Sequence, residues 1–187
     1  LRIHIVMVVW DVAKFHDSLQ YDDFSQSCEE EQYGYKRSAL TFVVHASPRV
    51  LTIKQALGRM LSSVGRSILA GCQRSQTIAR ACTNNAVNKL RTNFGTASSG
   101  NTSHNGIRVY QHVDDLAQMM WHVDEKVLAS KAARSARVWV KETQRMRLGV
   151  SNKTIIVPPA APANAVQQAL DDEGIVVNIT KRAVDLG

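Results

Sequence analysis

The sequence has few cysteines, and their spacing does not fit a metal-binding module or a disulfide framework. Cys28, Cys72 and Cys82 form an odd set without a CxxC pair. Disulfide-stapled secreted domains and zinc modules need even sets or closely paired cysteines. The histidines do not supply metal-ligand spacing either. The pattern argues against a zinc site and predicts reduced structural thiols in an intracellular protein.

The chain also lacks a long hydrophobic run and an internal repeat. No apolar segment approaches the roughly 20 residues of a transmembrane helix. The apolar stretch Leu1–Val9 continues directly into Trp10 and Asp11, without the small-residue cleavage site of a signal peptide. We therefore expect no membrane partner.

The bulk composition indicates a globular and basic protein. The chain has 187 residues, 44% of them hydrophobic, which is enough for one domain with a substantial core. Twenty-three Lys and Arg residues against 16 Asp and Glu give a net charge of +7. An excess of positive charge favours polyanionic partners, although it does not identify one.

Hydrophobic patterning predicts strands mixed with helices. Strands are expected at Leu1–Trp10, Ile107–Val113, Asp115–Trp121, Thr154–Val157 and Ile175–Thr180. Helices are expected at Ser75–Thr92, Asp124–Arg147 and Ala163–Asp172, with Gly149 ending the second and Gly174 capping the third. Hairpins combined with helices favour an α+β fold with helices on one face of an antiparallel sheet.

Other segments give weaker signals. Ser25–Arg37 is polar and is expected to be exposed, and Asn93–Asn105 is expected to be a loop. Arg66–Leu69 is interpreted as a short strand. Ser38–His45 fits a strand or a helical turn, and the periodicity of Val50–Leu61 does not decide between helix and strand.

Two acidic sites follow strand-like segments far apart in the sequence. Asp114 and Asp115 follow a short β-type run, where a hairpin tip is expected. Asp11 ends the apolar run that begins near Ile3. Two Mg²⁺ ions about 3.5–4 Å apart need carboxylates from separate segments, and such sites serve phosphoryl and nucleotidyl transfer. The two segments therefore predict one shared metal site.

Five segments resemble, in order, the palm motifs of reverse transcriptases of the non-LTR-retrotransposon branch. In the first motif an Asp at a strand end is followed by a Lys, an aromatic residue and a second Asp, as at Asp11, Lys14 and Asp17. The others are a glycine turn opening a helix, an Asp-Asp hairpin, a Lys after a helix and a Leu-Gly turn. They correspond to 67–75, 110–116, 148–154 and 183–187.

The resemblance implies an RNA-directed DNA polymerase palm, with RNA template, DNA primer and dNTP as partners. It implies two Mg²⁺ ions, with Mn²⁺ as an alternative, held by Asp11, Asp114, Asp115 and the Val12 carbonyl. Lys153 would neutralise or protonate the departing pyrophosphate. The implied nucleotide contacts are Phe15, His16, Gly71 and Gln73, with Arg74 on nucleic acid.

Three positions depart from the family pattern. His112 replaces an aromatic residue before the Asp-Asp pair, and His16 replaces the aromatic residue that excludes the ribose 2′-hydroxyl. Arg74 stands where the second motif has a glycine. An imidazole ring is smaller than a six-membered aromatic ring and gains charge near neutral pH. These changes put sugar selectivity in doubt and are of the kind that a decaying element accumulates.

Each assignment has a simpler reading. Asp11 fits a helix cap, Asp114 and Asp115 a solvated turn, Lys153 a surface lysine, and Gly71 an ordinary turn glycine. The arginines of the long helix fit a solvated face.

The chain is expected to be one incomplete palm domain over residues 1–187, with fingers before it and a thumb after it. Other domains of a longer polyprotein are implied, and a mobile-element origin suggests a nuclear location. This piece alone is expected to be inactive. Two alternatives stay open: a non-catalytic basic remnant that binds nucleic acid, and an unrelated basic α/β metal-dependent phosphoesterase. The latter requires Asp11 to lie far from Asp114.

Overall fold

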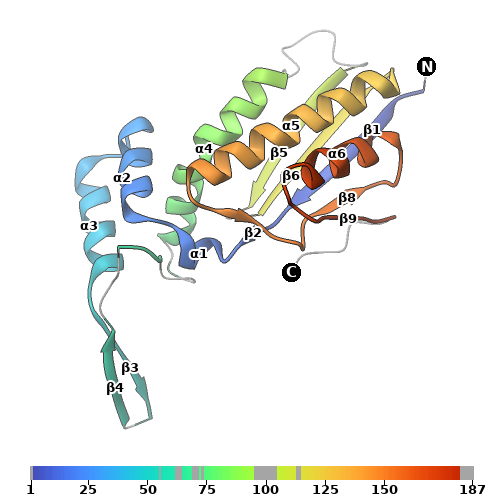
Figure 1. Ribbon diagram of the computed structural model, residues 1–187. Helices are drawn as coiled ribbons and strands as arrows, with labels where there is room; N and C mark the ends of the chain where they lie inside the picture. The colour runs from blue at the N-terminus through green and yellow to red at the C-terminus, as the bar shows by residue number, and fades with distance from the viewer. Residues whose placement is uncertain are drawn as a thin grey trace. The chain divides into compact units, whose positions relative to one another are not determined.

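Strand β1 (His4–Trp10) lies at the centre of a five-stranded sheet in the computed structural model (Figure 1). The structure describes residues 2–54, 56–61, 65–68, 72, 74–94, 105–112 and 115–181, with residues 51, 53, 61 and 112 described by their backbone alone. The chain forms two compact units, one of Leu1–Ala13 with Asn84–Gly187 and one of Lys14–Thr83. The α+β class predicted from the order of elements is confirmed.

The sheet of the first unit has the order β5-β6-β1-β8-β9. Its other strands are β5 (Asn105–His112), β6 (Asp115–His122), β8 (Ile155–Val157) and β9 (Asn178–Ile179). All neighbours are antiparallel except β8 and β9, which are parallel. Helix α6 (Ala161–Asp171) connects this parallel pair, as a crossover connection requires.

Side chains of β1 alternate between a buried and an open face of the sheet. Val6, Val8 and Trp10 are at most 1% exposed, whereas Ile5 is 49% exposed and Val9 is half-buried. The buried face is covered by α6 and by α5 (Glu125–Arg145), which pack on each other and on the strands (Figure 1). Period-two burial under two helices explains why this run of apolar residues forms a strand.

The predicted helix at Asp124–Arg147 is α5, and Asp124 is its N-cap. The Asp124 carboxylate accepts hydrogen bonds from the backbone N–H groups of Lys126 and Val127, at 2.8 and 3.1 Å. These bonds lower the pKa of Asp124 below its usual value. The expected apolar stripe is buried and includes Leu128, Ala132, Ala136 and Val140.

The end of α5 differs from the prediction that Gly149 stops it. The residue in the left-handed conformation is Arg147, with φ of 57°. The N–H of Leu148 donates back to the carbonyl of Thr143 at 2.9 Å, which closes the helix. Gly149 instead begins β7 (Gly149–Val150), which pairs with β2 (Val12–Ala13).

A series of side-chain hydrogen bonds crosses the core between the sheet and α5. The Trp10 indole N–H donates to the side-chain oxygen of Gln118 at 3.1 Å, and the amide nitrogen of Gln118 donates to the Ser135 hydroxyl. Gln118 and Ser135 are fully buried. Trp10 also packs on Trp139, with ring centroids 6.1 Å apart. The last residue of β1 is therefore fixed to both β6 and α5.

The described residues of the second unit form three helices, a hairpin and the start of a fourth helix. Its elements are α1 (Phe15–Ser18), α2 (Tyr21–Glu30), α3 (Tyr35–Ala46), β3 (Arg49–Ile53), β4 (Ala56–Leu61) and the first half of α4 (Ser75–Phe94). Val50–Leu61, which periodicity left undecided, belongs to the antiparallel hairpin β3–β4. Ser38–His45 lies within α3.

Ser25–Arg37 is largely exposed, as expected, although α2 continues through Glu30 and buries Cys28. The short strand expected at Arg66–Leu69 is not found among the described residues. Arg66 makes only an isolated bridge with Gln20 instead of starting a strand, and Leu69 lies outside the described residues. The predicted helix at Ser75–Thr92 is present as α4. In the described part of the chain, every helix is too short or too polar to cross a membrane.

Gln118→Ala is expected to destabilise the protein by about 2–4 kcal/mol. The variant leaves a cavity in the core and removes the acceptor of the Trp10 indole N–H. Urea denaturation measures the loss. Gln168→Ala, on α6 with a side-chain bond to exposed Asp172, is the matched control and is expected to change stability by less than about 0.5 kcal/mol. Equal effects of the two variants would show that the hydrogen bonds of Gln118 with Trp10 and Ser135 do not stabilise the protein.

Cys28 and Cys82 are expected to resist thiol reagents in the folded protein at pH 8. Burial raises the pKa of both thiols, that of Cys82 to about 12, so the reactive thiolate is scarce. Labelling of a Cys72→Ala variant before and after unfolding in urea measures this protection. Equal labelling rates in the two states would contradict the burial of these thiols.

Candidate active site

The pairing of β1 with β6 brings two of the predicted metal ligands to one end of the sheet. The ladder runs from His4 opposite His122 to Trp10 opposite Leu116. Asp11 and Asp115 are each the next residue beyond that last pair. Directly opposed residues of antiparallel strands have Cα atoms about 5 Å apart. Two acidic segments separated by about a hundred residues of sequence thus end side by side.

The alternation of the strands also places both residues on the open face. Trp10 and Leu116 point into the core and are at most 1% exposed. Asp11 and Asp115 follow and precede them, so strand geometry directs their side chains to the opposite face. Both aspartates are half-buried.

The backbone of Asp11 is held by the turn that carries Lys153. The N–H of Asp11 donates to the Thr154 hydroxyl at 3.1 Å, and its carbonyl accepts from the N–H of Ser151 at 2.8 Å. Ser151 also accepts a bond from the N–H of Lys153, through its hydroxyl, at 3.1 Å. Thr154 is fully buried, whereas Lys153 is exposed. Lys153 therefore lies on a short turn fixed to Asp11.

Val12 continues from Asp11 into β2. Its side chain is buried, and it pairs with Val150 of β7. The simpler reading of Asp11 as a helix cap does not hold, because the N-cap of α1 is Lys14, which has a φ of 49° and no side-chain cap.

Two of the predicted nucleotide-binding residues, Phe15 and His16, are described in the second unit. Phe15 is buried, and its ring meets the ring of half-buried His16 edge-on at 5.6 Å. The carbonyl of His16 accepts from the N–H of Ile68 at 2.8 Å, and the carbonyl of Leu19 accepts from Ser67 at 3.0 Å. Hydrogen bonds thus join the first-motif segment to the start of the second-motif segment.

Arg74 directly precedes α4 and is exposed. Its carbonyl accepts from the N–H of Ile78, the first helical bond of α4. His45 is buried in the same unit, and its pKa is lowered by burial and by the positive charges of Arg49 and Arg74. The local potential around the start of α4 is therefore positive.

Asp114, Gly71 and Gln73 lie outside the described residues, as does the turn at 183–187. Within the described residues, no three His, Cys, Asp or Glu side chains are grouped as metal ligands. The roles of all predicted site residues stay predictions. The donors that are described, two carboxylates and a backbone carbonyl, are the hard oxygen ligands that Mg²⁺ prefers.

The residues that hold the site in place are not among the predicted site residues. Ser151 and Thr154 bind the backbone of Asp11, and Gln118 holds Trp10 from within the core. Their partners are 108 to 143 residues away along the chain. A buried polar residue inside an apolar strand pattern, as at Gln118, is the only signal that the sequence offers for them.

No known family model matches this chain, and no curated protein matches it. A solved structure does: apo telomerase from Candida tropicalis, truncated from its C-terminal domain, superposes with a TM-score of 0.58 at 14% sequence identity. The match covers 86% of this chain, which spans only 32% of the telomerase chain.

This likeness shows the fold. An antiparallel-dominated sheet with helices on one face is consistent with a polymerase palm-like α+β fold. The palm class inferred from the five motifs is therefore confirmed as a fold.

Thr154→Val is expected to destabilise the protein by about 1–3 kcal/mol and to increase amide exchange at Asp11. The nearly isosteric change removes the acceptor of the Asp11 N–H from a fully buried position. Urea denaturation and hydrogen exchange provide the two readouts. Thr52→Val, at an exposed position of β3, is the matched control. Unchanged exchange at Asp11 would show that Thr154 does not hold it.

Proposed function

We propose that this chain is the palm region of an RNA-directed DNA polymerase that transfers nucleotides with two metal ions. The observation that supports this best is the β1–β6 register, which ends at Trp10 opposite Leu116 and leaves Asp11 and Asp115 as the next residue of each segment. The same register disagrees with an unrelated phosphoesterase whose two acidic segments are far apart.

Asp11, Asp114 and Asp115, with the Val12 carbonyl, would hold two Mg²⁺ ions. Such ions activate a primer 3′-hydroxyl and neutralise the charge that develops on the leaving pyrophosphate. The residues of the chain supply oxygen donors from two strands fixed by one ladder. Lys153, on the turn bound to Asp11, would meet the pyrophosphate as a cation or as an acid.

The open face of the sheet is proposed to bind the template and primer. Helices α5 and α6 cover the opposite face of the sheet (Figure 1), and the open face carries Arg108 and Tyr110. Arg108 lies over the ring of Trp121, at 5.9 Å from its centroid. Exposed cations and aromatic rings are the groups that contact phosphates and bases without reading sequence.

Charge along the chain supports a nucleic-acid partner. Between Glu31 and Asp114 the sequence has no Asp or Glu, whereas it has eleven Lys and Arg residues. A long stretch with one sign of charge attracts phosphate backbones and releases their counterions.

We further propose that the chain belongs to a retroelement and works within a longer polypeptide with fingers and thumb. The order of the five motifs supports the retroelement origin. The short span of the match, about a third of the telomerase chain, is consistent with additional domains. A nuclear location is part of this proposal.

A non-catalytic nucleic-acid-binding remnant is the second candidate. It is favoured by exposed Arg74 at the start of α4, where the motif has a glycine and a side chain would crowd the nucleotide. Binding by such a remnant would be sensitive to salt and indifferent to Mg²⁺.

Asp11→Asn and Asp115→Asn are each expected to weaken Mn²⁺ binding by at least about tenfold. Replacing a residue that only hydrogen-bonds to a metal ligand already lowers metal affinity by about that factor. Electron paramagnetic resonance of free Mn²⁺ measures the affinity. Asp22→Asn, an exposed carboxylate on α2, is the matched control and is expected to leave it unchanged. If all three variants bind like the parent chain, the shared metal site does not exist.

Asp114→Asn is expected to abolish primer extension when the chain is joined to fingers and thumb, because a metal ligand is lost. Extension of a labelled primer on an RNA template provides the measurement. Salt-sensitive template binding should persist in the variant. Undiminished extension would reject the catalytic proposal, whereas binding without any extension in the parent would favour the remnant.

A further inference from the structure

A pocket lies in the first unit, at the opposite end of the sheet from Asp11. It has a volume of about 560 Å³ and lies among α5, the end of α4 and the start of β5. The polar residues that line it are Lys126, Ser130, Lys131, Arg134, Asn93 and Asn105. Asn105 pairs with His122, whereas Asp115 begins β6 at the other end. Eight residues of β6 span roughly 24 Å, so the pocket is remote from the candidate active site.

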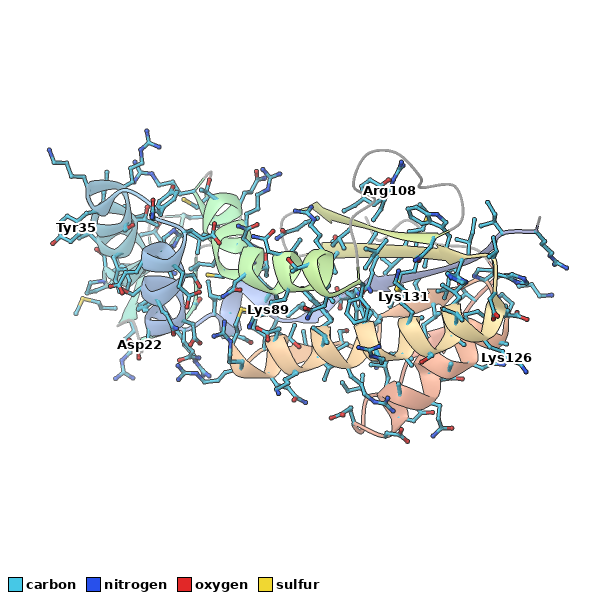
Figure 2. All side chains as sticks on the ribbon, turned by 90° about the horizontal axis from the view of Figure 1, so that it is seen from above. Asp22, Tyr35, Lys89, Arg108, Lys126 and Lys131 are labelled. Carbon is cyan, nitrogen blue, oxygen red and sulfur yellow. The ribbon has the colours of Figure 1, made fainter. Side chains whose placement is uncertain are left out.

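Lys126, Ser130 and Arg134 share one face of α5, because helical positions four apart lie above one another. Lys131 lies beside them, and Figure 2 shows Lys126 and Lys131 on this helix. The spacing of these residues along α5 therefore places three cations around one pocket.

Some basic residues of the unit are paired with a carboxylate, whereas these three cations have no acidic partner among the described residues. Arg137 pairs with Asp172 at 3.1 Å, and Lys89 with Glu142 at 2.8 Å. Among the described residues, no carboxylate lies within ion-pair distance of Lys126, Lys131 or Arg134. Gathering like charges without compensation is unfavourable unless an anion is bound.

The nearby acidic residues face other partners. The Asp124 carboxylate is bound to the backbone N–H groups that begin α5. The Glu125 carboxylate lies 3.7 Å from the His4 ring. No carboxylate lines the pocket among the described residues, so its charge is positive.

Two of the cations are held in place by neutral groups. The Lys131 ammonium donates to the side-chain oxygen of Asn105 at 2.8 Å. Burial lowers the pKa of Lys131, as expected for a cation without a counter-ion. The Arg134 guanidinium lies over the ring of Phe94, 5.8 Å from its centroid. Positioned cations with remaining N–H donors are suited to an anion with several acceptor oxygens.

We propose that this pocket binds the phosphate groups of a ligand. Lys126, Lys131 and Arg134 would supply the charge, and Asn93, Asn105 and Ser130 would supply neutral hydrogen-bonding groups. The site needs no divalent metal, shares no residue with the candidate active site, and does not depend on the proposed polymerase activity. The ligand is a free phosphate compound or a nucleic-acid strand, which carry the same group.

The test uses the 187-residue chain in EDTA with two probes: inorganic pyrophosphate and a single-stranded oligothymidylate of eight nucleotides. Calorimetry measures both affinities for the parent, for Lys126→Gln/Arg134→Gln, and for Arg137→Gln/Lys141→Gln. Each double variant removes two positive charges from exposed positions of α5. Only the first pair lines the pocket.

We expect the pocket variant to bind at least about tenfold more weakly, and the control to change by less than about threefold. If the loss affects pyrophosphate, the pocket takes free phosphate compounds. If only the oligonucleotide binds and shows the same selective loss, the pocket takes a strand. Equal losses in the two variants would overturn the proposal, because general attraction by net charge would then explain the binding. No binding of either probe would also overturn it, because the pocket would then have no affinity for phosphate groups.

Discussion

The pairing of β1 with β6 is the constraint on which the candidate active site depends. This ladder joins the start of the chain to a strand more than a hundred residues later. It ends at Trp10 and Leu116, next to Asp11 and Asp115. Because register fixes both the position and the face of each side chain, Asp11 and Asp115 follow from the same seven pairs. A shift of one residue would turn Asp11 into the core and Trp10 outward. Burial of Trp10 and Leu116 makes that shift unfavourable.

Polar contacts add specificity to the β1–β6 register that the burial of apolar side chains favours. Trp10 is fixed through Gln118 to Ser135 of α5, so the acidic end of β1 is bound to a helix as well as to strands. Just beyond it, Ser151 and Thr154 hold the Asp11 backbone from the other side. A buried polar group without a partner is costly, so each of these contacts disfavours alternative packings. The candidate metal ligands are thereby set on a rigid support, as a site that must place ions within a fraction of an ångström requires.

The sequence predicted the parts of the fold that periodicity controls. The apolar run at β1, the stripe of α5 and the hairpin strands were expected within a few residues. The sequence did not predict the parts of the fold that depend on tertiary contacts. It left α3 undecided between helix and strand, and the left-handed residue that ends α5 is Arg147 instead of Gly149. For the site, motif order placed Asp11, Asp115 and Lys153 together. Ser151, Thr154 and Gln118 have no such local signature, because their partners are distant in sequence.

The most direct test of the account is a crystal structure of the chain with Mn²⁺, read from its anomalous scattering. The account predicts manganese between the carboxylates of Asp11 and Asp115, with two ions about 3.5–4 Å apart when both positions are filled. Manganese found only elsewhere, or the two carboxylates on opposite faces of the sheet, would contradict it.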